Sequence, residues 1–242
     1  MPLYSLFIHS LVHFVPSLLY LSDGGGMYAE TNPDNIIVEP WNAVTSLFLI
    51  VPAGYLFFKL QREGTFRKHP FLLYCIPLLA LGGLGSTLFH AFRASPFFLY
   101  LDVVPTLLLT LSISAYFWYR VVKKVWLVAL IVVGSVAIRF WLFFLGPTQL
   151  SINLSYFIGG VVIFVPTILI LIATRFEQSQ KIVLAVLLLS ISLLFRRLDT
   201  EFTYILPMGT HFLWHIFSAI GAFFLAEYLY FLDRRRVSLV TS

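Results

Sequence analysis

The chain has 242 residues, of which 60% are hydrophobic and 11% are charged. Soluble domains carry about 25% charged residues, and the mean hydropathy here is +0.91. This composition excludes a soluble globular protein, a disordered chain and a nucleic-acid-binding protein. The 16 basic residues outnumber the 11 acidic ones, and in a membrane protein such an excess usually sets orientation. The single cysteine, Cys75, excludes an intrachain disulfide.

Seven long apolar segments follow one another along the chain, each bounded by charge, proline or glycine. A helix that spans a bilayer needs about 20 mostly apolar residues, whereas barrel strands need only about 9–11 and alternate in polarity. The pattern therefore predicts an all-α membrane protein, a seven-transmembrane helix bundle with short loops. The predicted spans are 41–60, 70–91, 97–119, 125–146, 150–174, 181–197 and 207–232.

The basic residues predict how this bundle is oriented. Twelve of the 16 lie on one side, in three alternate connections and the C-terminal region, and the positive-inside rule makes that side cytoplasmic. Residues 22–39, which carry four acids and no Lys or Arg, are then outside. The expected parts are an N-terminal apolar segment with an acidic outer loop (1–39), a seven-helix transmembrane domain (40–236) and a cytoplasmic tail (237–242). The twelve basic residues are Lys59, Arg62, Arg67, Lys68, Arg120, Lys123, Lys124, Arg175, Lys181, Arg234, Arg235 and Arg236.

Residues 3–21 allow two interpretations. They are apolar but contain His9, His13 and Pro16, so they form either an eighth span or a helix in the membrane interface. The segment has no charge, so the positive-inside rule does not decide. We favour the interfacial helix.

Five polar side chains from three predicted spans are expected at one depth of the membrane. Ionisable groups inside spans are costly and usually functional. The second span is predicted to run outward and the third and seventh inward, so all five lie near the outer ends of their helices. They are Ser86, His90, Asp102, His211 and His215.

The histidines among them predict a metal site. His211 and His215 are four residues apart and share one helix face, the spacing with which H-x-x-x-H helices bind zinc. Phe212 stands where H-E-x-x-H has its Glu, so the base must come from elsewhere. His90 could complete a three-histidine site with a fourth position for water, whose pKa zinc lowers to about 7. The alternative is a polar contact between helices.

The other two residues suit hydrolysis at such a site. Asp102 is a candidate general base or water orienter, and Ser86 could donate a hydrogen bond to a developing oxyanion. Taken alone, Ser86 would be a small packing residue. The convergence of all five at one depth favours the metal site.

On these residues the chain resembles the alkaline ceramidases and, more broadly, the CREST superfamily of seven-transmembrane hydrolases, which includes adiponectin-type receptors and GPI-remodelling proteins. That superfamily is marked by Ser-x-x-x-His late in span two, Asp early in span three and His-x-x-x-His in the last span. The likeness covers about residues 28–232, and the predicted orientation is that of the ceramidases. The closer ceramidase motifs here are Glu39-Pro40-Trp41-Asn42, Arg197-Leu198-Asp199 and Thr210-His211-Phe212-Leu213-Trp214-His215-Ile216.

The resemblance implies an enzyme that hydrolyses ceramide from the bilayer to a sphingoid base and a free fatty acid. Zn²⁺ held by His90, His211 and His215 would activate water, Asp102 would take or orient its proton, and Ser86 would steady the oxyanion. The expected location is a bacterial inner membrane, or an ER or Golgi membrane. The alternative is a lipid receptor, or a hydrolase of the same superfamily that acts on an ester or phospholipid.

The resemblance also implies a calcium site in the acidic loop. Glu30, Asn32 and Glu39 fit the family's Glu-x-Asn…Glu pattern, and oxygen ligands suit Ca²⁺. Met27 stands where the family has an Asp ligand. The alternative is an acidic loop without a metal, in which residues 32–34 form a turn.

Two further classes of seven-span protein are disfavoured. An ordinary retinal protein needs a lysine in its last span, and no lysine follows Lys181. A transporter usually shows internal repeats or broken helices at the midplane, whereas the polar residues here gather near one face.

Overall fold

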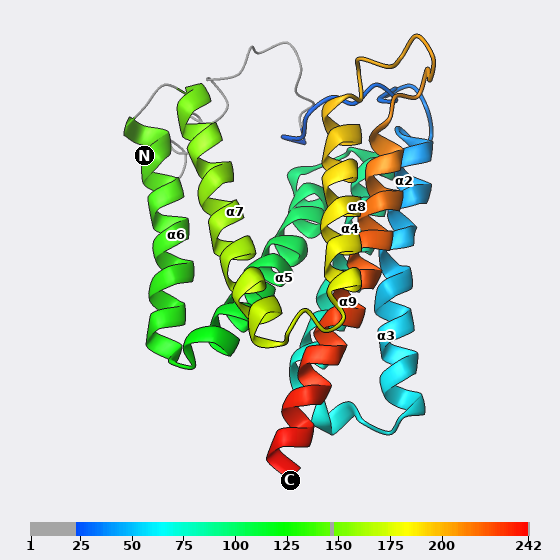
Figure 1. Cartoon of the computed structure of the whole chain (residues 1–242). Coiled ribbons are helices and arrows are strands. Elements are labelled where there is room, and N and C mark those ends of the chain that lie inside the picture. The colour runs from blue at the N-terminus through cyan, green and yellow to red at the C-terminus, as the bar shows by residue number, and fades with distance from the viewer. Residues whose placement is uncertain (1–22, 146–147, 242) are drawn as a thin grey trace. The chain divides into compact units, whose positions relative to one another are not determined.

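The computed structural model describes residues 23–145 and 148–241. The predictions for residues 3–21, including His9 and His13, lie outside the described residues. The described part is all-helical (Figure 1), as the sequence predicts, and it contains the following elements in chain order. They are α2 (Pro40–Ser46), η1 (Leu47–Leu49), α3 (Ile50–Arg62), η2 (Phe66–Lys68), α4 (Pro70–Phe92), α5 (Pro96–Val122), α6 (Val125–Leu145), α7 (Thr148–Ala173), α8 (Ser179–Arg197) and α9 (His211–Thr241).

Six segments in the described part of the chain are long and apolar enough to cross a membrane, which confirms a multi-pass membrane protein. The remaining predicted span, 150–174, lies in α7 (Thr148–Ala173), in which the side chains are described without a gap only over Phe157–Ala173, an apolar stretch of fewer than 18 residues. A seventh span and the orientation of the bundle therefore stay predictions. The six segments are Pro40–Arg62, Pro70–Phe92, Pro96–Val122, Val125–Leu142, Ser179–Arg197 and His211–Arg235.

The chain forms two compact units, and α5 and α8 each contribute to both. Unit 1 contains residues up to Pro105 and from Leu184 onward, and unit 2 contains Thr106–Val183. In unit 2, α6 packs along α7, and the carbonyl of Val162 accepts hydrogen bonds from Ser114 Oγ at 3.2 Å and Trp118 Nε1 at 2.8 Å. The predicted division into an outer N-terminal part, a transmembrane domain and a cytoplasmic tail, with boundaries after residues 39 and 236, stays a prediction.

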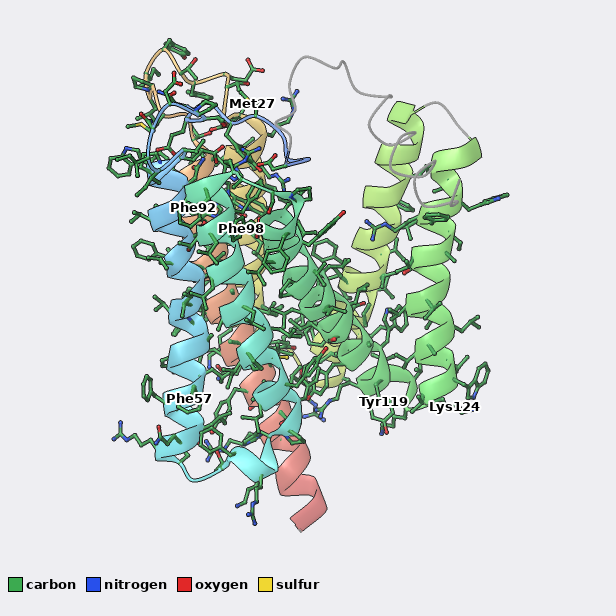
Figure 2. All side chains as sticks on the ribbon, turned by 180° about the vertical axis from the view of Figure 1, so that it is seen from behind. Met27, Phe57, Phe92, Phe98, Tyr119 and Lys124 are labelled. Atoms are coloured by element: carbon green, nitrogen blue, oxygen red, sulfur yellow. The ribbon has the colours of Figure 1, made fainter. Side chains whose placement is uncertain are left out.

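Unit 1 is built around α2, α3, α4 and α9. The first two are consecutive and run along both α4 and α9, as Figure 1 shows for α2 and α3 beside the orange-to-red α9. Both α2 and α4 begin with proline, Pro40 and Pro70, which suits the first helical position because its missing N–H would have no helical partner. Figure 2 shows Met27 and Phe92 at one end of this unit and Phe57 toward the other.

The last helix begins at His211, four residues later than the predicted start of the span. Gly209 has a φ of +72°, a left-handed conformation that L side chains avoid. The backbone N–H groups of Thr210 and His211 both donate to Asp199 Oδ1 at 2.8 Å. Because this carboxylate satisfies the first free N–H groups, the helix starts there, and His211 becomes its first residue.

Candidate metal centre

Three histidines meet at one end of unit 1. His90 lies in the last turn of α4, and His211 and His215 lie in the first turns of α9. Each side chain is only 1–2% exposed, and one ring nitrogen of each lies within 4.8 Å of the others. Among the described residues, no other set of three or more His, Cys, Asp or Glu side chains is arranged in this way. The predicted three-histidine cluster is therefore present.

Two of these histidines each have one ring nitrogen without a protein partner. His211 Nδ1 and His215 Nε2 are buried and accept or donate no hydrogen bond. A buried polar atom without a partner costs free energy, and a bound cation removes that cost. Imidazole nitrogen suits zinc among other transition metals. The donor set is thus compatible with zinc without identifying it.

Glu39 orients the third histidine. His90 Nδ1 is hydrogen-bonded to Glu39 Oε2, and because an ionised carboxylate only accepts, the nitrogen donates. Burial raises the pKa of Glu39, but hydrogen bonds from His90 and Thr31 and the nearby charge of Arg93 lower it below its ordinary value. The carboxylate thereby directs the other ring nitrogen of His90 toward the cluster. Such carboxylate–histidine pairs are the usual outer partners of metal-bound imidazole.

A chain of hydroxyl groups connects the histidines to Asp102. Ser46 Oγ donates to Ser86 Oγ at 3.0 Å and lies 3.4 Å from His215 Nδ1. Ser86 in turn is hydrogen-bonded to the carboxylate of Asp102. Gly85, next to Ser86, lies against the backbone of Leu101 so closely that a Cβ would overlap it. This close approach of α4 and α5 holds Ser86 and Asp102 together.

Tyr28 covers the cluster from the acidic segment, residues 23–39. Its ring stacks on His211 with centroids 3.9 Å apart and lies 5.2 Å from the ring of His90. Burial is the main cause that raises the pKa of Tyr28 to about 12. Its hydroxyl therefore stays protonated at neutral pH and remains a hydrogen-bond donor.

Asp199 connects the acidic segment to the helix that carries two of the histidines. Its Oδ2 accepts from Ala29 N at 2.8 Å, while its Oδ1 accepts from the first N–H groups of α9. The carboxylate is buried. The position of His211 thus depends on a side chain twelve residues earlier in the chain.

The three predicted calcium ligands are engaged with donors of the protein. Glu30 accepts from Trp41 N at 2.6 Å and Asn42 N at 2.9 Å, so it caps the start of α2. Burial raises the pKa of Glu30 above its ordinary value, and these two backbone hydrogen bonds offset only part of that rise. Asn32 Oδ1 accepts from the backbone N–H of Asp34 at 3.1 Å, which is the turn expected at residues 32–34. The calcium site stays a prediction.

Four of the residues around the histidines were not predicted as parts of the site: Tyr28, Ser46, Arg93 and Asp199. Only Asp199 carried a signal, as an acid shortly before a predicted helix, where a carboxylate can cap the N–H groups. The other three reach the cluster through tertiary packing. Neither the protein-family models nor the curated proteins compared with this chain contain a match to it.

Proposed function

We propose that the chain is an intramembrane zinc-dependent amide hydrolase of the alkaline ceramidase family, which cleaves ceramide to a sphingoid base and a free fatty acid. The observation that carries the proposal is the buried cluster of His90, His211 and His215 with two partnerless ring nitrogens. The hydrogen bond between Ser86 and Asp102 beside it adds a carboxylate and a hydroxyl. These are the groups that hydrolysis of an amide requires.

Zinc held by the three histidines would supply Lewis acidity and a water molecule of lowered pKa. Asp102 accepts the proton that the water loses as its oxygen bonds to the carbonyl carbon. Ser86 keeps its proton and donates a hydrogen bond to the carbonyl oxygen as negative charge develops there. When the C–N bond breaks, Asp102 returns the proton to the leaving nitrogen, so that the products are a free amine and a carboxylic acid.

The location of the cluster suits a lipid substrate. Its histidines lie in the last turn of α4 and the first turns of α9 rather than halfway along these helices, and both helices contain a segment apolar enough to span a membrane. We propose seven spans with the N-terminus outside, so that the cluster lies near the outer surface. Ceramide presents its amide close to the headgroup region while its two chains extend into the hydrocarbon, which matches that depth.

The test is to purify the full-length protein in detergent, measure its zinc content, and incubate it with ceramide. We expect about one zinc per chain, as in a three-histidine site, and release of a sphingoid base. His215→Ala should lose both. The control is Lys59→Met, which breaks an ion pair between α3 and α9 with Glu227, away from the histidines. It should keep both the zinc and the ceramide hydrolysis.

Three results would count against the proposal. Absence of zinc from the wild-type protein would refute the metal centre, and full activity of His215→Ala would refute its role in catalysis. Release of fatty acid from an ester lipid or phospholipid, with none from ceramide, would support a hydrolase but refute ceramide as its substrate.

A further inference from the structure

We infer that Arg93 is a positioning residue of the histidine cluster. Its guanidinium provides the positive charge that pairs with two buried carboxylates, Asp23 and Glu39. The inference rests on the metal centre proposed above. Arg93 acts on that centre through Glu39, which holds His90. It is not proposed to contact the metal or the substrate.

The guanidinium is surrounded by acceptors. Arg93 Nε donates to Asp23 Oδ2 at 2.5 Å and Nη2 donates to Asp23 Oδ1 at 3.2 Å, a two-point fork of the kind that arginine forms with carboxylates. Nη1 donates to Glu39 Oε1, and Nη2 also donates to the carbonyl of Gly26 at 3.0 Å. Arg93 is 5% exposed, and its guanidinium lies over the ring of Phe89 at 4.5 Å.

The two carboxylates would be unstable without this cation. Both Asp23 and Glu39 are 0% exposed, and a buried charge is tolerated only when it is paired and hydrogen-bonded. Asp23 lies in the acidic segment and Glu39 precedes α2, so Arg93 joins both to the end of α4. The residue sits in a left-handed conformation at φ +48°, three residues after His90, and this turn directs its side chain back toward the cluster.

Both oxygens of Glu39 are thereby assigned. Oε1 accepts from Arg93 and from Thr31, while Oε2 accepts from His90 Nδ1 and, at 3.3 Å, from Asn42 Nδ2. Removing Arg93 would leave Oε1 with Thr31 as its one donor among the described residues and would weaken the hold of the carboxylate on His90. Loss of an outer partner of a metal ligand typically weakens metal affinity by about 10–100-fold.

The same geometry bears on calcium. A divalent cation at the acidic segment would need oxygens that are free to coordinate it, and here the carboxylates of Asp23 and Glu39 already bind the guanidinium. We therefore expect metal binding at the histidines to be independent of Ca²⁺.

The experiment titrates the full-length protein in detergent, stripped of metal by a chelator, with Co²⁺, whose visible spectrum reports the ligands around it. For Arg93→Met we expect a dissociation constant about 10–100-fold above that of the wild type and an altered spectrum. Lys59→Met loses a cation from another partly buried ion pair of the same unit and should match the wild type in both. Millimolar Ca²⁺ should leave wild-type binding unchanged.

Arg93→Lys keeps the charge but not the fork, and we expect its affinity to lie between those of wild type and Arg93→Met. If Arg93→Met does not fold, Arg93→Lys decides: a wild-type dissociation constant and spectrum overturn the inference. The inference is also overturned if Arg93→Met binds Co²⁺ like Lys59→Met, or if Ca²⁺ tightens wild-type binding. Failure of the wild-type protein itself to bind Co²⁺ would refute the metal centre of the proposed function, and with it this inference.

Discussion

Asp199→Asn should destabilise the protein and weaken its metal centre together. The carboxylate accepts three backbone N–H groups, each at 2.8 Å. In the variant, the amide oxygen can replace Oδ1 toward Thr210 and His211, but the amide NH₂ then faces the N–H of Ala29, donor against donor. One hydrogen bond is lost and an N–H is left unpaired, and the remaining two bonds lose a charged acceptor. We expect the free energy of unfolding to fall by about 2–4 kcal/mol.

Cys75 provides the assay, because it is the only cysteine and is buried in α4. A fluorogenic maleimide reacts with it as the protein unfolds on heating in detergent, and Co²⁺ titration of the same samples measures the metal centre. The matched control is Asp34→Asn, the same chemical change at an exposed acid of the acidic segment, which should change stability by no more than about 0.5 kcal/mol.

The reasoning would be refuted if Asp199→Asn unfolded at the same temperature as Asp34→Asn and bound Co²⁺ equally well. In that case Asp199 would neither start α9 nor fix His211. A loss of stability with unchanged metal affinity would confine Asp199 to a role in folding.

Three further predictions follow from the same geometry. Gly209→Ala places a Cβ at φ +72° against the carboxylate of Asp199 and should lower the free energy of unfolding by about 2 kcal/mol or more. Gly54→Ala, at a position in α3 with open space around it, should raise the free energy of unfolding by about 0.5–1 kcal/mol. Maleimide labelling of Cys75 during heating compares the two variants. Asp102→Asn should keep Co²⁺ binding but lower kcat for ceramide by about 10²–10⁴, and wild-type turnover would remove it from catalysis. Tyr28→Ala, unlike Tyr28→Phe, loses the stack on His211, and its metal affinity should fall about twofold to tenfold in Co²⁺ titrations.

The helical architecture and the histidine cluster could be predicted from the sequence for a specific reason. Charged residues are so scarce that each apolar stretch stands out, and the four-residue spacing of His211 and His215 places both on one face of any helix. His90 could be joined to them because the second and last predicted spans run in opposite directions, so the end of one and the start of the other lie on the same side of the membrane. All three are found together.

The start of α9 was the part of the site that the apolar pattern misplaced. Residues 207–210 carry no charge, so the apolar pattern gives no boundary there. The boundary comes from a backbone turn at Gly209 and from the carboxylate of Asp199, neither of which contributes to an apolar pattern.

By itself, the sequence determined that this is a helical membrane protein and which histidines could share a metal, because both properties follow from composition and from the period of a helix. Only the tertiary structure decided what surrounds them. The contacts of Arg93 with Asp23 and Glu39 join residues 70 and 54 positions apart, and Tyr28 reaches His211 across most of the chain. Such pairings depend on how helices and loops pack, because a lone buried charge or ring nitrogen is stable only where folding brings it a partner.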